Sequence, residues 1–166
     1  MKILLHDLSV IEFEALYPNT DMNTTVISDN GAIHNCIGCF GCWLKTPGVC
    51  VLKDNYNNMG ELLSKCDELK IISRCIYGSY SPLIRNVLDR SISYLLPYFI
   101  SKNAETHHAM RYKNKISLSV HFYGSDITEN EKETAKRLVK ANCINFCDKY
   151  NVNFHTRFQD LEGVVK

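Results

Sequence analysis

Four cysteines within fifteen residues are the side chains best placed to do chemistry in this sequence. They follow the spacing C-x2-C-x2-C-x7-C in the stretch 35–54, which also contains the only tryptophan, Trp43. Glycines between the cysteines permit tight turns, so the thiols can converge. Such a segment either binds a group through sulfur or forms a wall of a binding site. The four residues are Cys36, Cys39, Cys42 and Cys50.

The composition predicts one ordinary globular domain over residues 1–166. Apolar residues make up 45% and charged residues 22% of the chain, and the net charge is +1. With no basic cluster, nucleic acid is not an expected partner. The longest apolar run, 94–100, is short and broken by Pro97, so no membrane span is expected. Eight cysteines without an export signal indicate a reducing, cytoplasmic location.

Short apolar runs alternate with helical segments along the chain. Ser81 followed by Pro82 marks one helix start, and Thr128 with Glu131 forms a capping box at another. Alternating strands and helices predict a parallel sheet covered on both faces, with ligands at the carboxyl ends of its strands. Strands are expected at 2–6, 24–28, 69–73, 115–123 and 152–155; helices at 10–17, 55–65, 81–96 and 128–150; and a polar linker at 101–114.

Three loops are expected at those carboxyl ends, over residues 6–10, 30–54 and 74–81. The cysteine stretch belongs to the second. Parallel strands end at one edge of the sheet, so the three loops are predicted to meet there. The cysteines are therefore expected beside a ligand site.

Several segments together resemble the flavodoxin-like NAD(P)H-dependent FMN oxidoreductases, a group that includes the iron–sulfur flavoproteins. They are the cysteine stretch with its trailing Asp54, the loop CIYGSYS at 75–81 and the helix segment Leu88-Asp89-Arg90. The pairs His107-His108 and Arg111-Tyr112 look like a feature of one bacterial branch. The resemblance covers roughly residues 36–123, and it rests on the combination of these pieces.

The resemblance implies a three-layer flavodoxin-like fold with a five-stranded parallel sheet of order 2-1-3-4-5. It further implies FMN at the strand ends, NAD(P)H as electron donor, a small-molecule acceptor and a homodimer. The loop after the third strand would lie along the flavin ring, and no side chain is expected to act as an acid or base in catalysis. The implied cofactor-binding residues are Ser9, Trp43, Cys75, Ile76, Tyr77, Gly78, Ser79 and Tyr80.

The loop after the first strand departs from the family pattern. Relatives have a Gly-, Ser- and Thr-rich loop there that holds the FMN phosphate, whereas this chain reads HDLSVIE over 6–12, without glycine, lysine or arginine. A carboxylate about 4 Å from a phosphate would cost on the order of 4 kcal/mol at a surface-like dielectric. Asp7 therefore weakens the expected site unless it turns away, leaving Ser9 and helix N–H groups. Loose flavin binding is expected.

Three interpretations of the four clustered cysteines stay open. Their spacing matches the [4Fe–4S] ligands of the iron–sulfur flavoproteins, which need four convergent thiolates. Zinc is a second possibility, although structural zinc sites use two separated C-x2-C pairs, which are absent here. The third is a loop packed by thiols without metal. The remaining cysteines, Cys66, Cys75, Cys143 and Cys147, are expected to pack in the core.

Three functions follow from these patterns. The first is an FMN-dependent reductase that passes electrons from NAD(P)H to a small acceptor. The second is an electron carrier with flavin, a [4Fe–4S] cluster or both, and the third is a flavodoxin-like binding module that has lost its flavin. His107 and His108 lie either in a lid over the site or in an exposed linker, and Asp89-Arg90 is expected to anchor the helix end.

Overall fold

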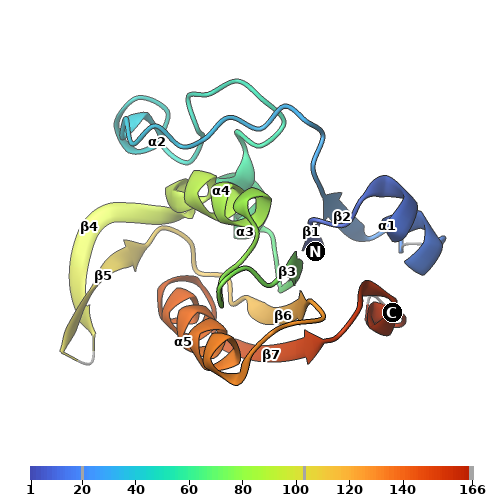
Figure 1. Cartoon of the computed structure of the whole chain (residues 1–166). Coiled ribbons are helices and arrows are strands. Elements are labelled where there is room, and N and C mark those ends of the chain that lie inside the picture. Colours follow the sequence, from blue (N-terminus) through green and yellow to red (C-terminus); the bar gives the residue numbers. More distant parts are fainter. Residues whose placement is uncertain (20, 103, 165–166) are drawn as a thin grey trace.

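The computed structural model describes residues 1–19, 21–102 and 104–164. Five parallel strands form one sheet in the order β2-β1-β3-β6-β7 (Figure 1). Counting only these five strands, this is the predicted order 2-1-3-4-5. The strands are β1 (Lys2–His6), β2 (Thr24–Ile27), β3 (Glu68–Arg74), β6 (Ser117–Tyr123) and β7 (Lys149–His155).

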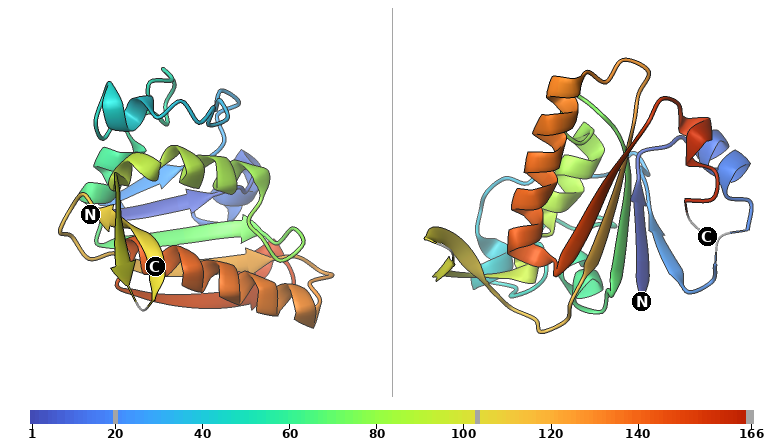
Figure 2. Two further views of the ribbon diagram at one scale, coloured as in Figure 1. Left: turned by 90° about the vertical axis from the view of Figure 1, so that its left-hand side faces the viewer. Right: turned by 90° about the horizontal axis from the view of Figure 1, so that it is seen from below.

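Helices cover both faces of the sheet, as predicted, but unequally (Figure 2). The larger core lies under α3 (Met59–Ser64), α4 (Pro82–Arg90) and α5 (Glu129–Phe146), where apolar strand residues such as Ile71 and Val120 are fully buried. A smaller cluster on the other face packs α1 (Val10–Leu16) and η2 (Phe158–Leu161) against Leu4 and Ile72. None of the described helices is long and apolar enough to cross a membrane.

The largest departure from the predicted elements follows α4. The helix expected to continue to residue 96 ends at Arg90, and a short turn, η1 (Ile92–Tyr94), leads into a β-hairpin. Its strands, β4 (Leu95–Lys102) and β5 (Glu105–Met110), replace most of the predicted polar linker, of which residue 103 lies outside the described residues. Pro97 cannot continue a helix, and the aromatic residues after it favour a strand.

Other boundaries shift by a few residues. The predicted helix at 55–65 is confined to α3, and α5 stops at Phe146 rather than near Tyr150, because β7 already begins at Lys149. The capping box at Thr128 and the proline start of α4 are both present. Local end signals were therefore more reliable than predicted lengths.

Candidate functional site

A buried ion pair attaches the cysteine loop to the end of α4. Both guanidinium nitrogens of Arg90 donate to the carboxylate of Asp54, each at 2.8 Å, and both side chains are almost completely buried. Arg90 also donates to the carbonyl of His34 at 2.7 Å and contacts the Cys50 sulfur at 3.1 Å. These bonds hold the pKa of Asp54 at about 2. The expectation that Arg90 anchors the helix end is confirmed.

The four clustered cysteines line one cavity of about 560 Å³ together with Trp43. Its other walls come from the C-terminal ends of α4 and α5 and from the hairpin. These elements and the short helix α2 (Gly41–Leu44) lie toward the end of the sheet where the strands begin (Figure 2). We call this end the amino edge, and the opposite end the carboxyl edge. The lining residues used below are Phe40, Trp43, Asp89, Tyr94, His108, Asn142, Asn145 and Phe146.

The cavity is not at the carboxyl edge, where the loop order had predicted the cysteines. The loop leaves β2 at the carboxyl edge, but none of residues 74–81 lines the cavity with the cysteines. A loop of about thirty residues is long enough to run past α4 to the opposite end of the domain. Asn142, Asn145 and Phe146 were not predicted as site residues, because nothing in the sequence distinguishes them from ordinary positions of a long helix.

Trp43 is fixed in the cavity wall by the hairpin. Its indole N–H donates to the carbonyl of Leu95 at 3.0 Å, and its ring lies 5.1 Å from that of His108 and 5.6 Å from that of Phe40. The Nδ1 atom of His108 is 2.8 Å from the carbonyl of Leu96. His108 therefore packs against the cavity wall. His107 instead contacts Asn145 of α5 at 3.2 Å.

The arrangement of the thiols does not fit a metal site. Among the residues that the structure describes, no group of three or more His, Cys, Asp or Glu side chains is placed to hold a metal ion. Cys50 is engaged by Arg90, and burial raises the pKa of the Cys42 thiol, with the neighbouring cysteines adding to the effect. At Cys42 the raised pKa opposes the thiolate form that metals require. The predicted [4Fe–4S] and zinc ligands share a cavity without forming a ligand set.

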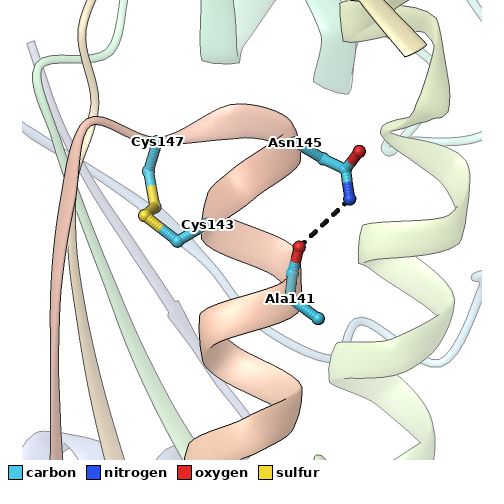
Figure 3. Close-up of a disulfide and its surroundings, with 4 residues drawn as sticks. All are labelled: Ala141, Cys143, Asn145 and Cys147. Carbon is cyan, nitrogen blue, oxygen red and sulfur yellow. Dashed lines mark hydrogen bonds between the residues drawn. A yellow bond between two sulfur atoms is a disulfide. The ribbon is translucent and has the colours of Figure 1, made fainter. Parts of the chain in front are cut away.

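Two of the remaining cysteines form a disulfide. Cys143 and Cys147, at the end of α5, are bonded with their Cα atoms 4.6 Å apart (Figure 3). The sequence predicted core packing for these two residues, and Cys143 is buried while Cys147 packs against the core. The bond between them was not predicted; the i, i+4 spacing brings the side chains together at a helix end. Cys66 and Cys75 do pack against the core as predicted, and burial raises the pKa of the Cys66 thiol to about 11.

At the carboxyl edge, Asp7 is directed into the sheet. Its carboxylate accepts from the backbone N–H of Arg74 at 2.9 Å and from the hydroxyl of Tyr123 at 3.1 Å. Burial raises the pKa of Asp7, and it also raises the pKa of Tyr123. Asp7 thus joins the ends of β1, β3 and β6, occupying the position at which this class of sheet usually opens toward a ligand.

The start of α1 is filled by its own carboxylate. Glu12 Oε2 accepts from the backbone N–H of Ser9 at 2.8 Å and from its hydroxyl at 2.7 Å, while the Ser9 hydroxyl accepts from the Glu12 N–H at 3.3 Å. This is a complete capping box on a helix of only seven residues. Ser9 was predicted to help hold phosphate, but both its N–H and its hydroxyl are bonded to Glu12.

The loop after β3 folds as a tight turn packed on α5. Ile76 and Ser79 exchange both backbone hydrogen bonds at 2.9 Å, and Tyr77 and Gly78 both have positive φ values, 51° and 72°. A Cβ at Gly78 would lie 2.8 Å from the carbonyl oxygen of Glu131, so this glycine is required by packing. The Tyr77 side chain is 88% exposed, whereas Tyr80 is buried against Phe122.

These residues fit one half of an FMN molecule. Tyr77 presents an exposed aromatic ring at the carboxyl edge, which suits stacking against a flavin ring. The phosphate half does not fit at Ser9, because Glu12 already accepts from both the N–H and the hydroxyl of that residue. Tyr80 is buried in the core rather than exposed to a ligand.

The fold is flavodoxin-like, and it is shared with solved structures of low sequence identity. An FMN-dependent NADH-azoreductase from Bacillus anthracis, in complex with FMN, aligns with a TM-score of 0.52 at 9% identity over 99% of this chain and 98% of that chain. An NADPH-quinone reductase from P. pentosaceus aligns with a TM-score of 0.51 at 14% identity, covering 94% and 86%. General stress protein 14 from Treponema denticola, in complex with FMN, gives 0.50 at 15%, covering 99% and 94%.

The sequence matches no family model and no curated protein. At such identities the solved structures establish the fold alone.

Proposed function

We propose that this chain is a flavin-dependent oxidoreductase that passes electrons from NAD(P)H to a small acceptor and binds its flavin loosely. The observation that carries the proposal is the fold, which aligns along nearly its whole length with the FMN-bound azoreductase structure. A bound flavin would take hydride from the nicotinamide and deliver electrons to the acceptor. The protein would supply position, and no side chain is assigned an acid or base role.

The exposed ring of Tyr77 is the proposed contact for the flavin ring. It stands on a rigid two-residue turn whose backbone bonds and packing against α5 fix its place at the end of β3. Ring stacking is favourable for any flavin, whether or not a phosphate follows. The proposed site therefore recognises the flavin through its ring.

The start of α1 lacks a conventional phosphate loop. We expect this to make the proposed site insensitive to the flavin phosphate. Phosphate sites use several charge-assisted hydrogen bonds of about 1.5–3 kcal/mol each, and here both donors of Ser9 already bond to Glu12. The protein should therefore bind FMN and riboflavin with similar affinity, unlike a protein with a dedicated phosphate loop.

Titration with FMN and with riboflavin, followed by quenching of flavin fluorescence, tests this proposal. We expect dissociation constants within about threefold of each other, in a range that permits exchange. Glu12→Gln should tighten FMN about tenfold and leave riboflavin unchanged, because it removes a negative charge from the helix start. Glu14→Gln, an exposed change on the same helix, is the matched control.

Rapid mixing of the flavin-loaded protein with NADH or NADPH then tests the enzyme. Bleaching of the flavin absorbance with either nucleotide is expected, and its absence with both would contradict the reductase proposal. Tight binding of FMN with no binding of riboflavin would contradict loose, ring-based recognition.

The capping box at Ser9 also favours a second candidate, a flavodoxin-like binding module without flavin. Both donors of Ser9 bond to the Glu12 carboxylate, so a carboxylate of the chain itself already lies at the start of α1. If neither FMN nor riboflavin binds at millimolar concentration, and the Glu12→Gln variant binds neither, this candidate replaces the first. An absorbance spectrum of protein purified without oxygen should then show no flavin bands.

A further inference from the structure

The cavity at the amino edge combines free thiols with mostly apolar walls. Its volume of about 560 Å³ is in the range of ligand pockets. Cysteine side chains behave as small apolar groups in packing, so the thiols do not interrupt an apolar lining. Aromatic residues line the cavity from the cysteine loop, from η1 and from α5, namely Phe40, Trp43, Tyr94 and Phe146. A flat apolar molecule therefore suits these walls.

Two of the four thiols that line the cavity are exposed. Cys36 and Cys39 are free and exposed, whereas Cys42 and Cys50 are half-buried. Burial raises the pKa of the Cys42 thiol, and Cys50 accepts a hydrogen bond from Arg90. An exposed cysteine is nucleophilic at neutral pH through the small fraction of its thiol that is ionised. Cys36 and Cys39 are therefore the thiols of this cavity that can attack a bound molecule.

The charges around the cavity favour neither sign in a ligand. Among the described lining residues, Asp89 is the one carboxylate and none is lysine or arginine. Arg111 lies beside these residues, where its Nε donates to the carbonyl of Ser93 at 2.9 Å, next to the lining residue Tyr94. A carboxylate in the wall and a guanidinium just outside it give no net preference for a cation or an anion. A neutral molecule is therefore the class of ligand that these walls support.

We propose that this cavity binds neutral planar electrophiles of the quinone class and that Cys36 or Cys39 adds to them. The sulfur lone pair forms a bond to an unsubstituted ring carbon, and the π electrons that it displaces come to rest on the quinone oxygens. Those oxygens take up the thiol proton and the proton of the attacked carbon, which gives a hydroquinone thioether. No other oxidant or reductant takes part in this step.

The thiols lie at the opposite edge of the sheet from the proposed flavin contact at Tyr77. Addition to a quinone at the amino edge requires neither flavin nor NAD(P)H. The inference therefore goes beyond the proposed oxidoreductase function and does not depend on it.

Menadione, a neutral planar quinone with one unsubstituted position on its quinone ring, is the reactive probe. The full chain is mixed with menadione in the absence of NAD(P)H and oxygen, and adducts are counted by intact mass and located by peptide mapping. We expect the first adduct on Cys36 or Cys39. Because binding precedes addition, its rate of formation should saturate as the menadione concentration rises.

A matched ligand that cannot react separates binding from addition. 2,3-Dimethyl-1,4-naphthoquinone has the same two rings as menadione but no unsubstituted position on its quinone ring. At a saturating concentration it should slow the addition of menadione at least about tenfold. It should also quench the fluorescence of Trp43, the only tryptophan of the chain, in a saturable way. Acrylamide, a small electrophile without a ring, should react at a rate proportional to its concentration.

Variants of the cavity test the ring contact and the nucleophiles. Trp43→Leu should raise the half-saturating concentration of menadione about tenfold and leave the reaction with acrylamide unchanged, since the thiols stay exposed. Tyr150→Leu, which removes an exposed ring outside the lining residues, is the control. Cys36→Ser combined with Cys39→Ser should abolish the adduct. Tryptophan quenching by the matched ligand should persist in that double variant, which shows that the cavity is still formed.

Two results would overturn the proposal. One is a rate that rises linearly with menadione concentration or that the matched ligand fails to slow, as expected of unspecific surface thiols. The other is a first adduct at Cys42, at Cys50 or outside the cavity. Riboflavin binding, measured in parallel, should be the same in the double cysteine variant as in the unaltered chain. Failure of the cavity proposal would therefore leave the flavin proposal standing, and the reverse is also true.

Discussion

The two edges of the sheet differ in how their side chains are used. At the carboxyl edge, Asp7, Ser9 and Glu12 satisfy one another or the backbone, and Tyr80 is buried. At the amino edge, a cavity stays open between the cysteine loop, the hairpin and two helix ends, with Asn142 Oδ1 unsatisfied. The edge at which this fold usually binds ligands is thus the more closed one.

This difference shows that a fold and its ligand site can separate. The flavodoxin-like sheet specifies which strand ends come together, but short substitutions at those ends decide whether a ligand finds free donors. Here the hydrogen-bond donors of Ser9, in the loop after β1, bond to Glu12 of the same segment. The long cysteine loop, attached to α4 by one buried ion pair, forms a concave surface elsewhere.

Among changes at the amino edge, the removal of Arg90 should lower the free energy of unfolding most. Arg90→Met leaves the buried carboxylate of Asp54 without its partner, which should cost about 3–5 kcal/mol of unfolding free energy. Urea unfolding measures this, with Arg85→Met on the exposed side of α4 as control. A loss below about 1 kcal/mol would mean that the loop is not held by this pair.

At the carboxyl edge, Gly78→Ala should be more damaging than Gly31→Ala. Both glycines have φ near 72°, so both variants carry backbone strain of about 1–2 kcal/mol. Only at Gly78 does the new Cβ meet α5, which should add about 1–3 kcal/mol. Equal losses in thermal unfolding would show that the turn is not packed on α5.

The Asp54–Arg90 pair should also make the free energy of unfolding depend on pH in the acidic range. The pKa of Asp54 lies at about 2 in the folded chain against an ordinary value of 3.8, so its contribution is present above pH 3.8 and is lost as the pH falls toward 2. Urea midpoints across this range should fall less steeply in an Asp54→Asn variant. Parallel profiles would show that other carboxyl groups control acid unfolding.

The disulfide at the end of α5 should contribute least to the free energy of unfolding. It closes a loop of only a few residues, so the chain-entropy term is at most about 2 kcal/mol. Thiol titration in denaturant should count six free cysteines before reduction and eight after it. Cys147→Ser should lower the unfolding free energy by no more than reduction does. Eight free thiols at the outset would contradict the disulfide.

The sheet and the helix starts could be predicted because they depend on local patterns. Runs such as Lys2–His6 are apolar enough to be buried strands, and Ser81-Pro82 and Thr128-Glu131 are end signals with a local mechanism. The hairpin after η1 was missed because Leu95 and Leu96 read as the end of the preceding helix and the residues of β5 read as a polar linker.

The sequence by itself determined the order of elements, the cysteine spacing and the absence of a conventional phosphate loop. Only the tertiary structure decided that Asp7 turns into the sheet, that Glu12 occupies the start of α1 and that the cysteines lie at the amino edge. The physical reason is that periodicity and caps act over a few residues. The course of a long loop is set instead by distant contacts, here the bond between Asp54 and Arg90.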